Sequence, residues 1–161
     1  MAVGPNDNTV PPVPEIAAFE ELIRPEMRRR LGPRPDKIQP IFGTAFPNFS
    51  FNRTQAHTLR VWHPKGVNKT EIWVWAYVDR AAPEQVKDAM RLASLRSFSP
   101  AGTYEQDDMD NWKGCSDTSR GAVSRRFSLN MQMGLGHERF NQEFGAWTSD
   151  FRMSESKHRH F

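Results

Sequence analysis

The sequence contains a single cysteine, Cys115, among 161 residues. One cysteine excludes an internal disulfide and is consistent with a reducing cytoplasm, where we expect the protein to work. No apolar run approaches the ~18–20 residues that a membrane helix needs. The N-terminal sequence MAVGPNDNTVPPVPE lacks the basic and apolar regions of a signal peptide. We therefore expect a globular cytoplasmic protein with no membrane association.

The excess of positive over negative charge is small, because the formal net charge is only +3. The arginines cluster locally, around residues 28–30 and 120–126, and do not form a broad basic stripe. A protein that binds nucleic acid would show such a stripe with aromatic side chains at stacking positions, whereas the aromatics here lie within apolar patterns. We therefore expect solvated arginines on helix ends and loops, and no nucleic-acid partner.

Histidine pairs with metal-ligand spacing are absent as well. His57 and His63 share a face of a predicted strand, but six residues separate them by ~20 Å, too far to bind one ion together. His137 is isolated, and His158 and His160 lie in a charged tail. No histidine pair in the sequence therefore has the spacing of metal ligands.

The apolar pattern that is present predicts an α+β protein built on an antiparallel sheet. Residues 1–14 are rich in Pro, Gly and Asn and are interpreted as an irregular arm, and residues 15–161 as one domain. Residues 15–31 repeat Ile16, Phe19, Ile23 and Met27 at helical spacing and end at Gly32-Pro33. Segment 38–51 is apolar but broken by Pro and Gly, which predicts short strands with a kink.

Segments 57–63 and 70–79 predict two strands of a hairpin, joined by the turn-rich PKGVNK. The second strand is apolar on both faces, which predicts that both faces are covered. Residues 83–97 form a helical pattern that begins with a proline. Segment 127–133, FSLNMQM, alternates apolar and polar residues as a half-buried strand does.

The segment TYEQDDMDNW, residues 103–112, contains four carboxylates and two aromatic rings. If residues 101–117 form a helix, Tyr104, Asp108, Trp112 and Cys115 share one stripe, in which Asp108 is the acid. A buried, unpaired carboxylate costs several kcal/mol or takes up a proton, so it needs a cation or a metal. Spacing alone leaves two other interpretations open: Asp108 pairs with an arginine, or the helix is rotated so that Asp108 is solvated.

These residues carry a resemblance to a known family. The sequence FPNFSF…TLRVWHPKGVNKTEIWVWAYVDRAAPE…LRSFSPAGTYEQDDMDNW resembles the α subunits of Rieske non-haem iron aromatic-ring-hydroxylating dioxygenases, of the biphenyl, naphthalene and phenylpropionate types. The likeness covers about residues 40–161. Its most specific parts are RVWHPKG, the block FS-AG---EQDD--NW at residues 98–112, and SDFRMSE at residues 149–155.

The resemblance implies a helix-grip-like catalytic domain that binds mononuclear Fe(II) with two histidines and one carboxylate. In that family the second aspartate of the DD pair is the carboxylate, which here is Asp108. Phe98 and Tyr104 then stand at substrate-pocket positions. Ala56, Thr58 and Val61, on the hairpin strand, are further pocket candidates, and plain core packing is the alternative interpretation of these three. Asn111 and Trp112 are expected beside the iron ligand.

Parts of the family pattern are missing from this sequence. The Rieske domain with its Cys-His/Cys-His 2Fe-2S motif and the segment with the two iron-binding histidines are not present. We therefore expect an incomplete catalytic domain, cut at both ends and inactive by itself. The parent protein is expected to cis-dihydroxylate aromatic rings with O2 in aromatic compound catabolism. Its expected partners are NAD(P)H-linked ferredoxin and reductase donors and a small β subunit, in an assembly of three α subunits with or without β subunits.

A second hypothesis assigns the chain to a different class of protein. In it, the same fold is a non-enzymatic module that binds hydrophobic ligands and has lost its metal function. Stoichiometric iron in a folded preparation would count against this hypothesis.

Overall fold

A computed structural model describes residues 13–37, 42–54, 56–149 and 154–155. The chain divides into two compact units, a larger one that extends to Gly121 and a smaller one from Ala122 onward. The predicted irregular arm, residues 1–14, lies almost wholly outside the described residues. Each unit is described by itself below.

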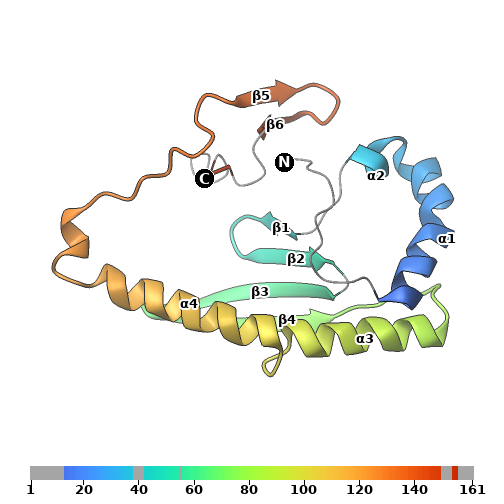
Figure 1. Cartoon of the computed structure of the whole chain (residues 1–161), viewed down its shortest axis with the longest axis horizontal. Coiled ribbons are helices and arrows are strands. Elements are labelled where there is room, and N and C mark those ends of the chain that lie inside the picture. Colours follow the sequence, from blue (N-terminus) through green and yellow to red (C-terminus); the bar gives the residue numbers. More distant parts are fainter. Residues whose placement is uncertain (1–12, 38–41, 55, 150–153, 156–161) are drawn as a thin grey trace. The chain divides into compact units, whose positions relative to one another are not determined.

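The larger unit has the predicted α+β architecture, with a four-stranded antiparallel sheet in the order β1-β2-β3-β4 (Figure 1). Its strands are β1 (Phe42–Ala45), β2 (Phe49–Arg53), β3 (His57–Gly66) and β4 (Lys69–Ala76). The predicted hairpin is confirmed, because β3 pairs antiparallel with β4 from Thr58↔Ala76 to Gly66↔Lys69. The expected short strands with a kink are β1 and β2, which are joined by a turn that contains a cis Phe46–Pro47 peptide.

Helices α1 (Pro14–Leu31) and α3 (Glu84–Phe98) agree with the two helices predicted from periodicity, and α4 (Thr103–Ser119) agrees with the helix assumed for residues 101–117. A fourth, short helix is α2 (Arg34–Lys37). In Figure 1, α3 and α4 follow one another along β3 and β4. Among the described residues, no helix combines the length and apolar character needed to cross a membrane.

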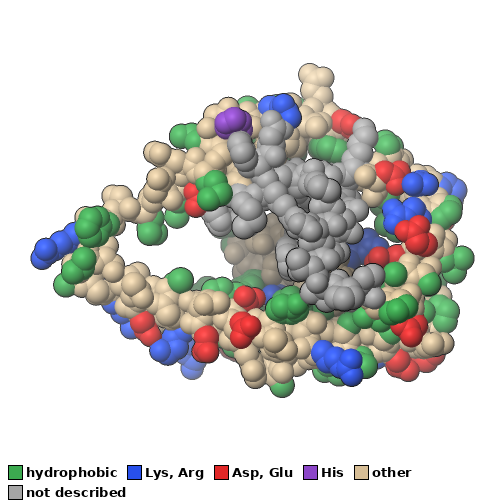
Figure 2. Space-filling model, viewed as in Figure 1, with side chains coloured by type: hydrophobic (Ala, Val, Ile, Leu, Met, Phe, Trp, Pro, Cys, Tyr) green, Lys and Arg blue, Asp and Glu red, His purple; other side chains and the backbone are tan. Residues whose placement is uncertain are grey.

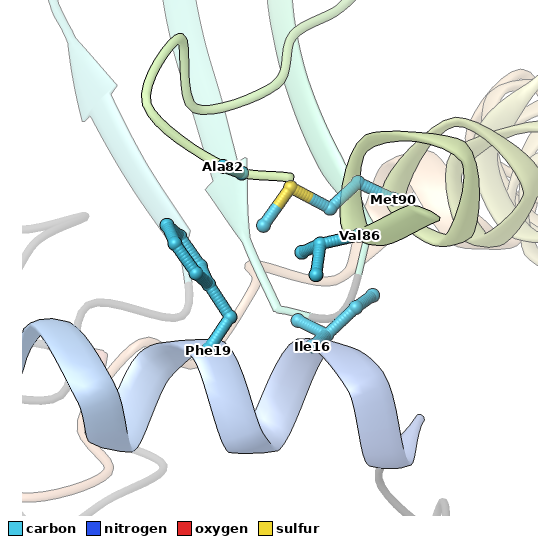
Figure 3. Close-up of a cluster of buried hydrophobic side chains, with 5 residues drawn as sticks. All are labelled: Ile16, Phe19, Ala82, Val86 and Met90. Carbon is cyan, nitrogen blue, oxygen red and sulfur yellow. The ribbon is translucent and has the colours of Figure 1, made fainter. Parts of the chain in front are cut away.

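The hydrophobic core lies between α1 and α3 (Figure 3). Ile16 and Phe19 point from α1 toward Val86 and Met90 of α3, and Ala82 of the preceding loop closes the cluster. Ile16 and Phe19 are among the positions that helical spacing marked as apolar, so the same residues fix this helix and its packing. Burying each large side chain of this kind contributes about 1.5–3 kcal/mol.

The two faces of the sheet have different surroundings. Arg60 and Trp62 of β3 contact α4, because Arg60 pairs with Glu105 and the rings of Trp62 and Trp112 lie 5.5 Å apart. Since side chains alternate along a strand, Thr58 shares this helix-facing side with them. The Nε1 of Trp62 also donates a hydrogen bond to Ser50 Oγ on β2, at 2.8 Å.

The opposite face carries the aromatic side chains of β4. Trp73 is 51% exposed and Trp75 47% exposed, and their rings meet edge to face at 6.1 Å. The alternation predicted for this strand is therefore correct, but the expected cover over its second face is not provided by the described residues. The strand also ends at Ala76 and not at residue 79.

The arginines near the end of α1 are paired with acids and do not form a basic patch. Arg28 contacts Asp36 at 2.8 Å, and Glu26 accepts from both Arg29 and Arg30 at 2.6 Å. Figure 2 shows basic and acidic side chains interspersed over α1 and α2. This arrangement agrees with solvated arginines and offers no uniform positive field to a nucleic acid there.

The smaller unit contains the 3₁₀ helix η1 (Ser124–Arg126) and the hairpin of β5 (Glu138–Asn141) and β6 (Ala146–Ser149). The rings of Phe140 and Trp147 meet edge to face across this hairpin, at 5.9 Å.

The strand predicted for residues 127–133 is wrong, because that segment is irregular, with Phe127 73% and Leu129 85% exposed. Alternating apolar residues stabilise a strand only where a neighbouring strand pairs with its backbone and packs against its side chains. At Met133 the carbonyl accepts a hydrogen bond from the Glu155 N–H at 3.1 Å and the N–H donates to Glu155 Oε2 at 3.0 Å, and Glu155 is not part of a strand.

A buried histidine links β3 to its neighbours. The ring of His57 stacks on Tyr77 with centroids 5.2 Å apart, and its backbone N–H donates to Ser94 Oγ on α3 at 3.2 Å. Among the described residues, neither ring nitrogen makes a well-aligned hydrogen bond. Burial lowers the pKa of His57 and the charge of Arg53 lowers it further, while the Thr54 backbone and Asp79 oppose the change.

This environment predicts how the stability of the larger unit depends on pH. Because the pKa of His57 is lower in the folded chain than its ordinary value of 6.5, the unfolded chain binds the proton first as the pH falls. The free energy of unfolding should therefore decrease as the pH is lowered below about 6.5. His57→Phe keeps a ring against Tyr77 but cannot take up a proton, so urea unfolding of this variant should show a flatter pH dependence between about pH 7 and pH 5.

The exposed His137→Phe serves as the control and should keep the pH dependence of the unchanged chain. A His57→Phe variant whose stability falls as steeply as that of the unchanged chain would contradict the prediction.

Candidate functional site

A tight turn joins α3 to α4 and sets where α4 begins. The Gly102 N–H donates to the Ser99 carbonyl at 2.7 Å, and Gly102 is buried. A Cβ at this position would lie 2.6 Å from the backbone of Ser97, which is too close for any side chain. Gly102 therefore allows the C-terminal end of α3 to pack against the first turn of α4.

The acid that points inward from α4 is Glu105, which is 1% exposed. Its Oε2 accepts a hydrogen bond from Arg60 Nη2 of β3 at 2.7 Å. Burial raises the pKa of the Glu105 carboxyl; the Arg60 guanidinium acts to lower it, and the charge of Asp108 acts to raise it. The arginine partner that the sequence left open for Asp108 thus belongs to Glu105.

Asp108 lies one turn after Glu105 and is half-buried, whereas Asp107 is exposed. The helical stripe chosen from spacing is only partly inward, because Tyr104 is 43% exposed and Cys115 is exposed. Helix α4 is rotated so that position 105 lies deepest, with position 108 beside it. The structure therefore separates the two aspartates of the DD pair in burial, in the order that the sequence predicted.

Aromatic rings gather where α3 ends and α4 begins. The rings of Phe98 and Tyr104 have centroids 5.5 Å apart, so the structure brings these two predicted pocket residues together. The guanidinium carbon of Arg60 lies 4.9 Å from the centroid of the Phe98 ring. Arg60 thus contacts both Phe98 and Glu105 from the sheet.

The other predicted site residues lie in different surroundings. Ala56 and Thr58 are buried, and Thr58 is on the sheet face that carries Arg60. Val61 is half-buried and pairs in register with Trp73, on the opposite face of the sheet from Thr58. On α4, Asn111 is exposed, and Trp112 meets the ring of Trp62 at an interplanar angle of 64°.

Sequence reasoning missed Arg60 and Glu105. A signal for the first existed, because Arg60 is a charged residue within the otherwise apolar strand segment TLRVW. Glu105 had no comparable signal, since it is one of four acids within residues 103–112 and nothing local distinguishes it from the others. Its burial depends on a partner 45 positions earlier in the chain.

A metal centre needs more ligands than this arrangement offers. Across the parts of the chain that the structure describes, no group of three or more His, Cys, Asp or Glu side chains could hold a metal ion. Asp108 is a half-buried carboxylate, which is a suitable hard ligand for Fe(II). The chemistry of Asp108 therefore suits one ligand of such a centre, and the described residues do not supply a complete ligand set.

Residues 6–154 match the family described as the ring hydroxylating alpha subunit (catalytic domain). The chain belongs to this family. It is 43% identical over 93 residues to biphenyl 2,3-dioxygenase subunit alpha of Rhodococcus jostii (strain RHA1), covering 58% of this chain and 20% of that protein. It is 39% identical over 111 residues to biphenyl dioxygenase subunit alpha of Paraburkholderia xenovorans (strain LB400), covering 67% and 24%.

The ring-hydroxylating fold is matched by solved structures as well. Naphthalene 1,2-dioxygenase with indole bound in the active site superposes with a TM-score of 0.79 at 29% identity, covering 92% of this chain and 34% of that one. Naphthalene 1,2-dioxygenase from Rhodococcus sp. bound to indole gives a TM-score of 0.68 at 32% identity, with coverage of 88% and 36%. The four-stranded sheet and its long helices are thus part of the ring-hydroxylating catalytic fold. The chain spans only about a fifth to a quarter of the length of the first curated relatives.

The ligand count predicts weak metal binding by the 161-residue chain alone. Tight Fe(II) binding depends on a complete ligand set, and Asp108 supplies one carboxylate. Chain incubated with Fe(II) and then desalted should therefore retain far less than one iron per chain, as measured by atomic emission. Near-stoichiometric iron that a chelator removes, and that Asp108→Ala eliminates, would contradict this prediction.

Proposed function

We propose that this chain is part of the α subunit of an oxygenase that adds both atoms of O2 to an aromatic ring, giving a cis-dihydrodiol. The family match over residues 6–154 supports the reaction class. The observation that carries the assignment of residues is the arrangement on α4, where half-buried Asp108 lies one turn after Tyr104, whose ring meets that of Phe98.

In this proposal Asp108 provides the carboxylate of a site for mononuclear iron, and two histidines come from a part of the protein outside this chain. When bound, the iron supplies the chemistry that activates O2. A site with one carboxylate and two imidazoles leaves other positions of the metal open, which is the reason that three protein ligands are sufficient.

The chain's own residues bind and orient the aromatic ring. Phe98 and Tyr104 contribute two neighbouring aromatic rings, Thr58 belongs to β3, and Ala56 immediately precedes that strand. Apolar walls exclude water and favour a flat hydrocarbon ring, which is the class of substrate we propose. Val61, on the other face of the sheet, has a smaller proposed part, and Asn111 and Trp112 are proposed to support the Asp108 region of α4.

The partners proposed for the whole protein follow from its being an α subunit. An α subunit of a multicomponent dioxygenase implies a β subunit and electron-transfer proteins. We propose a Rieske 2Fe-2S cluster and ferredoxin or reductase donors as the source of electrons, all of them outside this chain.

The proposal can be tested in a hybrid α subunit, in which this chain replaces the matching segment of the P. xenovorans biphenyl dioxygenase subunit alpha. The match of 39% identity over 111 residues defines the segment to exchange. The hybrid should bind iron and convert an aromatic hydrocarbon to a cis-dihydrodiol. A hybrid that folds and binds the hydrocarbon without binding iron or forming product would support the ligand-binding module instead.

The first substitution test separates the two aspartates. Asp108→Ala should reduce the mononuclear iron of the hybrid subunit to near zero and abolish product, because a triad that loses one ligand no longer holds the metal. Asp107→Asn, at the exposed neighbour, should retain both iron and activity. Iron is measured by atomic emission and product by chromatography. Loss of iron in Asp107→Asn together with its retention in Asp108→Asn would show that Asp107, and not Asp108, is the iron ligand.

The second test concerns the aromatic pair. Phe98→Val and Tyr104→Ala in the hybrid should change product ratios or substrate range while iron stays bound, since neither ring is a ligand. An apolar contact distinguishes related poses by about 1–3 kcal/mol, which redistributes products strongly. Leu95→Ala, at an exposed apolar position of α3, is the matched control and should leave the ratios unchanged. Unchanged ratios in both ring variants would remove these residues from the pocket.

A further inference from the structure

We infer that Arg60 is a positioning residue, which holds the first turn of α4 and the ring of Phe98 in place from β3. Its Nη2 donates to Glu105 Oε2 at 2.7 Å, and its guanidinium carbon stands 4.9 Å from the Phe98 ring centroid. The consequence for catalysis rests on the proposed function, whereas the contacts themselves do not.

The burial of this ion pair distinguishes it from the other charge pairs of α4. The side chain of Arg60 is 11% exposed and that of Glu105 2% exposed. The Lys113–Asp117 pair of the same helix has an equal N–O distance of 2.7 Å, but its side chains are 76% and 51% exposed. A buried charge that loses its partner is strongly unfavourable, whereas exposed pairs contribute little. The location of α4 therefore depends on Arg60 far more than on its surface pairs.

Arginine is suited to make both contacts at once. One terminal nitrogen at the edge of the planar guanidinium bonds to Glu105, while the cation lies over the Phe98 ring. Among the residues that the structure describes, Arg60 Nε and Glu105 Oε1 have no hydrogen-bond partner, so this pair is joined by one bond and not by a two-bond fork. A lysine ammonium is a compact point charge and cannot reproduce the planar group that serves both neighbours.

Through these contacts one side chain of the sheet holds Phe98 and the turn of α4 that lies between Tyr104 and Asp108. Glu105 directly follows Tyr104 and precedes Asp108 by one turn. Phe98, on the other side of Arg60, has its ring 5.5 Å from that of Tyr104. A shift of the guanidinium would therefore displace the aromatic pair and the helix that carries Asp108 together.

The experiment uses the hybrid α subunit with Arg60→Lys, Arg60→Met, Glu105→Gln and the double variant Arg60→Met/Glu105→Gln. The control is Lys113→Met/Asp117→Asn. Each is measured for urea midpoint, iron content, kcat, KM and product ratio. Arg60→Lys should fold and bind iron, but its product ratio should shift and its kcat should fall by about 10- to 100-fold, the loss that a misplacement of about 1 Å causes.

Stability provides the second readout. Arg60→Met leaves the buried Glu105 carboxylate without its partner, so this variant should have a lower urea midpoint than the double variant, in which both charges are removed. The control should match the unchanged hybrid in every measurement. If Arg60→Met does not fold, the double variant decides, and it should fold with an altered product ratio.

The outcomes separate this inference from the proposed function. An unchanged hybrid that folds but binds no iron and forms no product contradicts the proposed function, while the order of the urea midpoints still tests the ion pair. An active hybrid overturns the positioning role if Arg60→Lys and the double variant keep its product ratio and kcat. Equal midpoints for Arg60→Met and the surface control overturn the ion pair's role in holding α4.

Discussion

The contact between Arg60 and Glu105 is the interaction on which the geometry of the candidate site depends. Apolar packing between α1 and α3 supplies the core, but its buried residues on α3, Val86 and Met90, lie in the first half of the helix and not beside Phe98. The buried ion pair is what ties α4 to β3, with the Trp62–Trp112 ring contact further along the same helix. A directional, charge-assisted bond fixes position more sharply than area burial does, because the hydrophobic effect is not directional.

Most elements of the larger unit, but not the short helix α2, were predictable because each has a strong local pattern. Helices α1, α3 and α4 follow from apolar spacing and from the Pro and Gly at their ends, and the β3–β4 hairpin follows from two apolar runs around a turn. The irregular segment 127–133 shows the limit of the same method. Its alternation is as regular as that of a strand, but a strand forms only where another strand lies beside it, and that information is not local.

The site was predictable only in part, for a related reason. Helical spacing placed Tyr104 and Asp108 on one stripe, and the family resemblance selected Asp108 from the DD pair. Arg60, on a strand that is distant in sequence, determines which stripe of α4 faces inward. The helix is rotated so that Glu105 lies deepest. One residue along a helix corresponds to a turn of about 100°, so a single tertiary partner is enough to change the deepest position.

The short turn at residues 99–102 has a consequence for how this protein can vary. Gly102 admits no side chain against the Ser97 backbone, so the spacing between Phe98 and Tyr104 is fixed by the backbone and not by the rings. Mutational libraries that aim at new substrates can therefore randomise the two aromatic positions freely, while length changes or larger residues in the turn would displace both at once. Because the rings touch, their substitutions should combine non-additively, and variants are best selected as pairs.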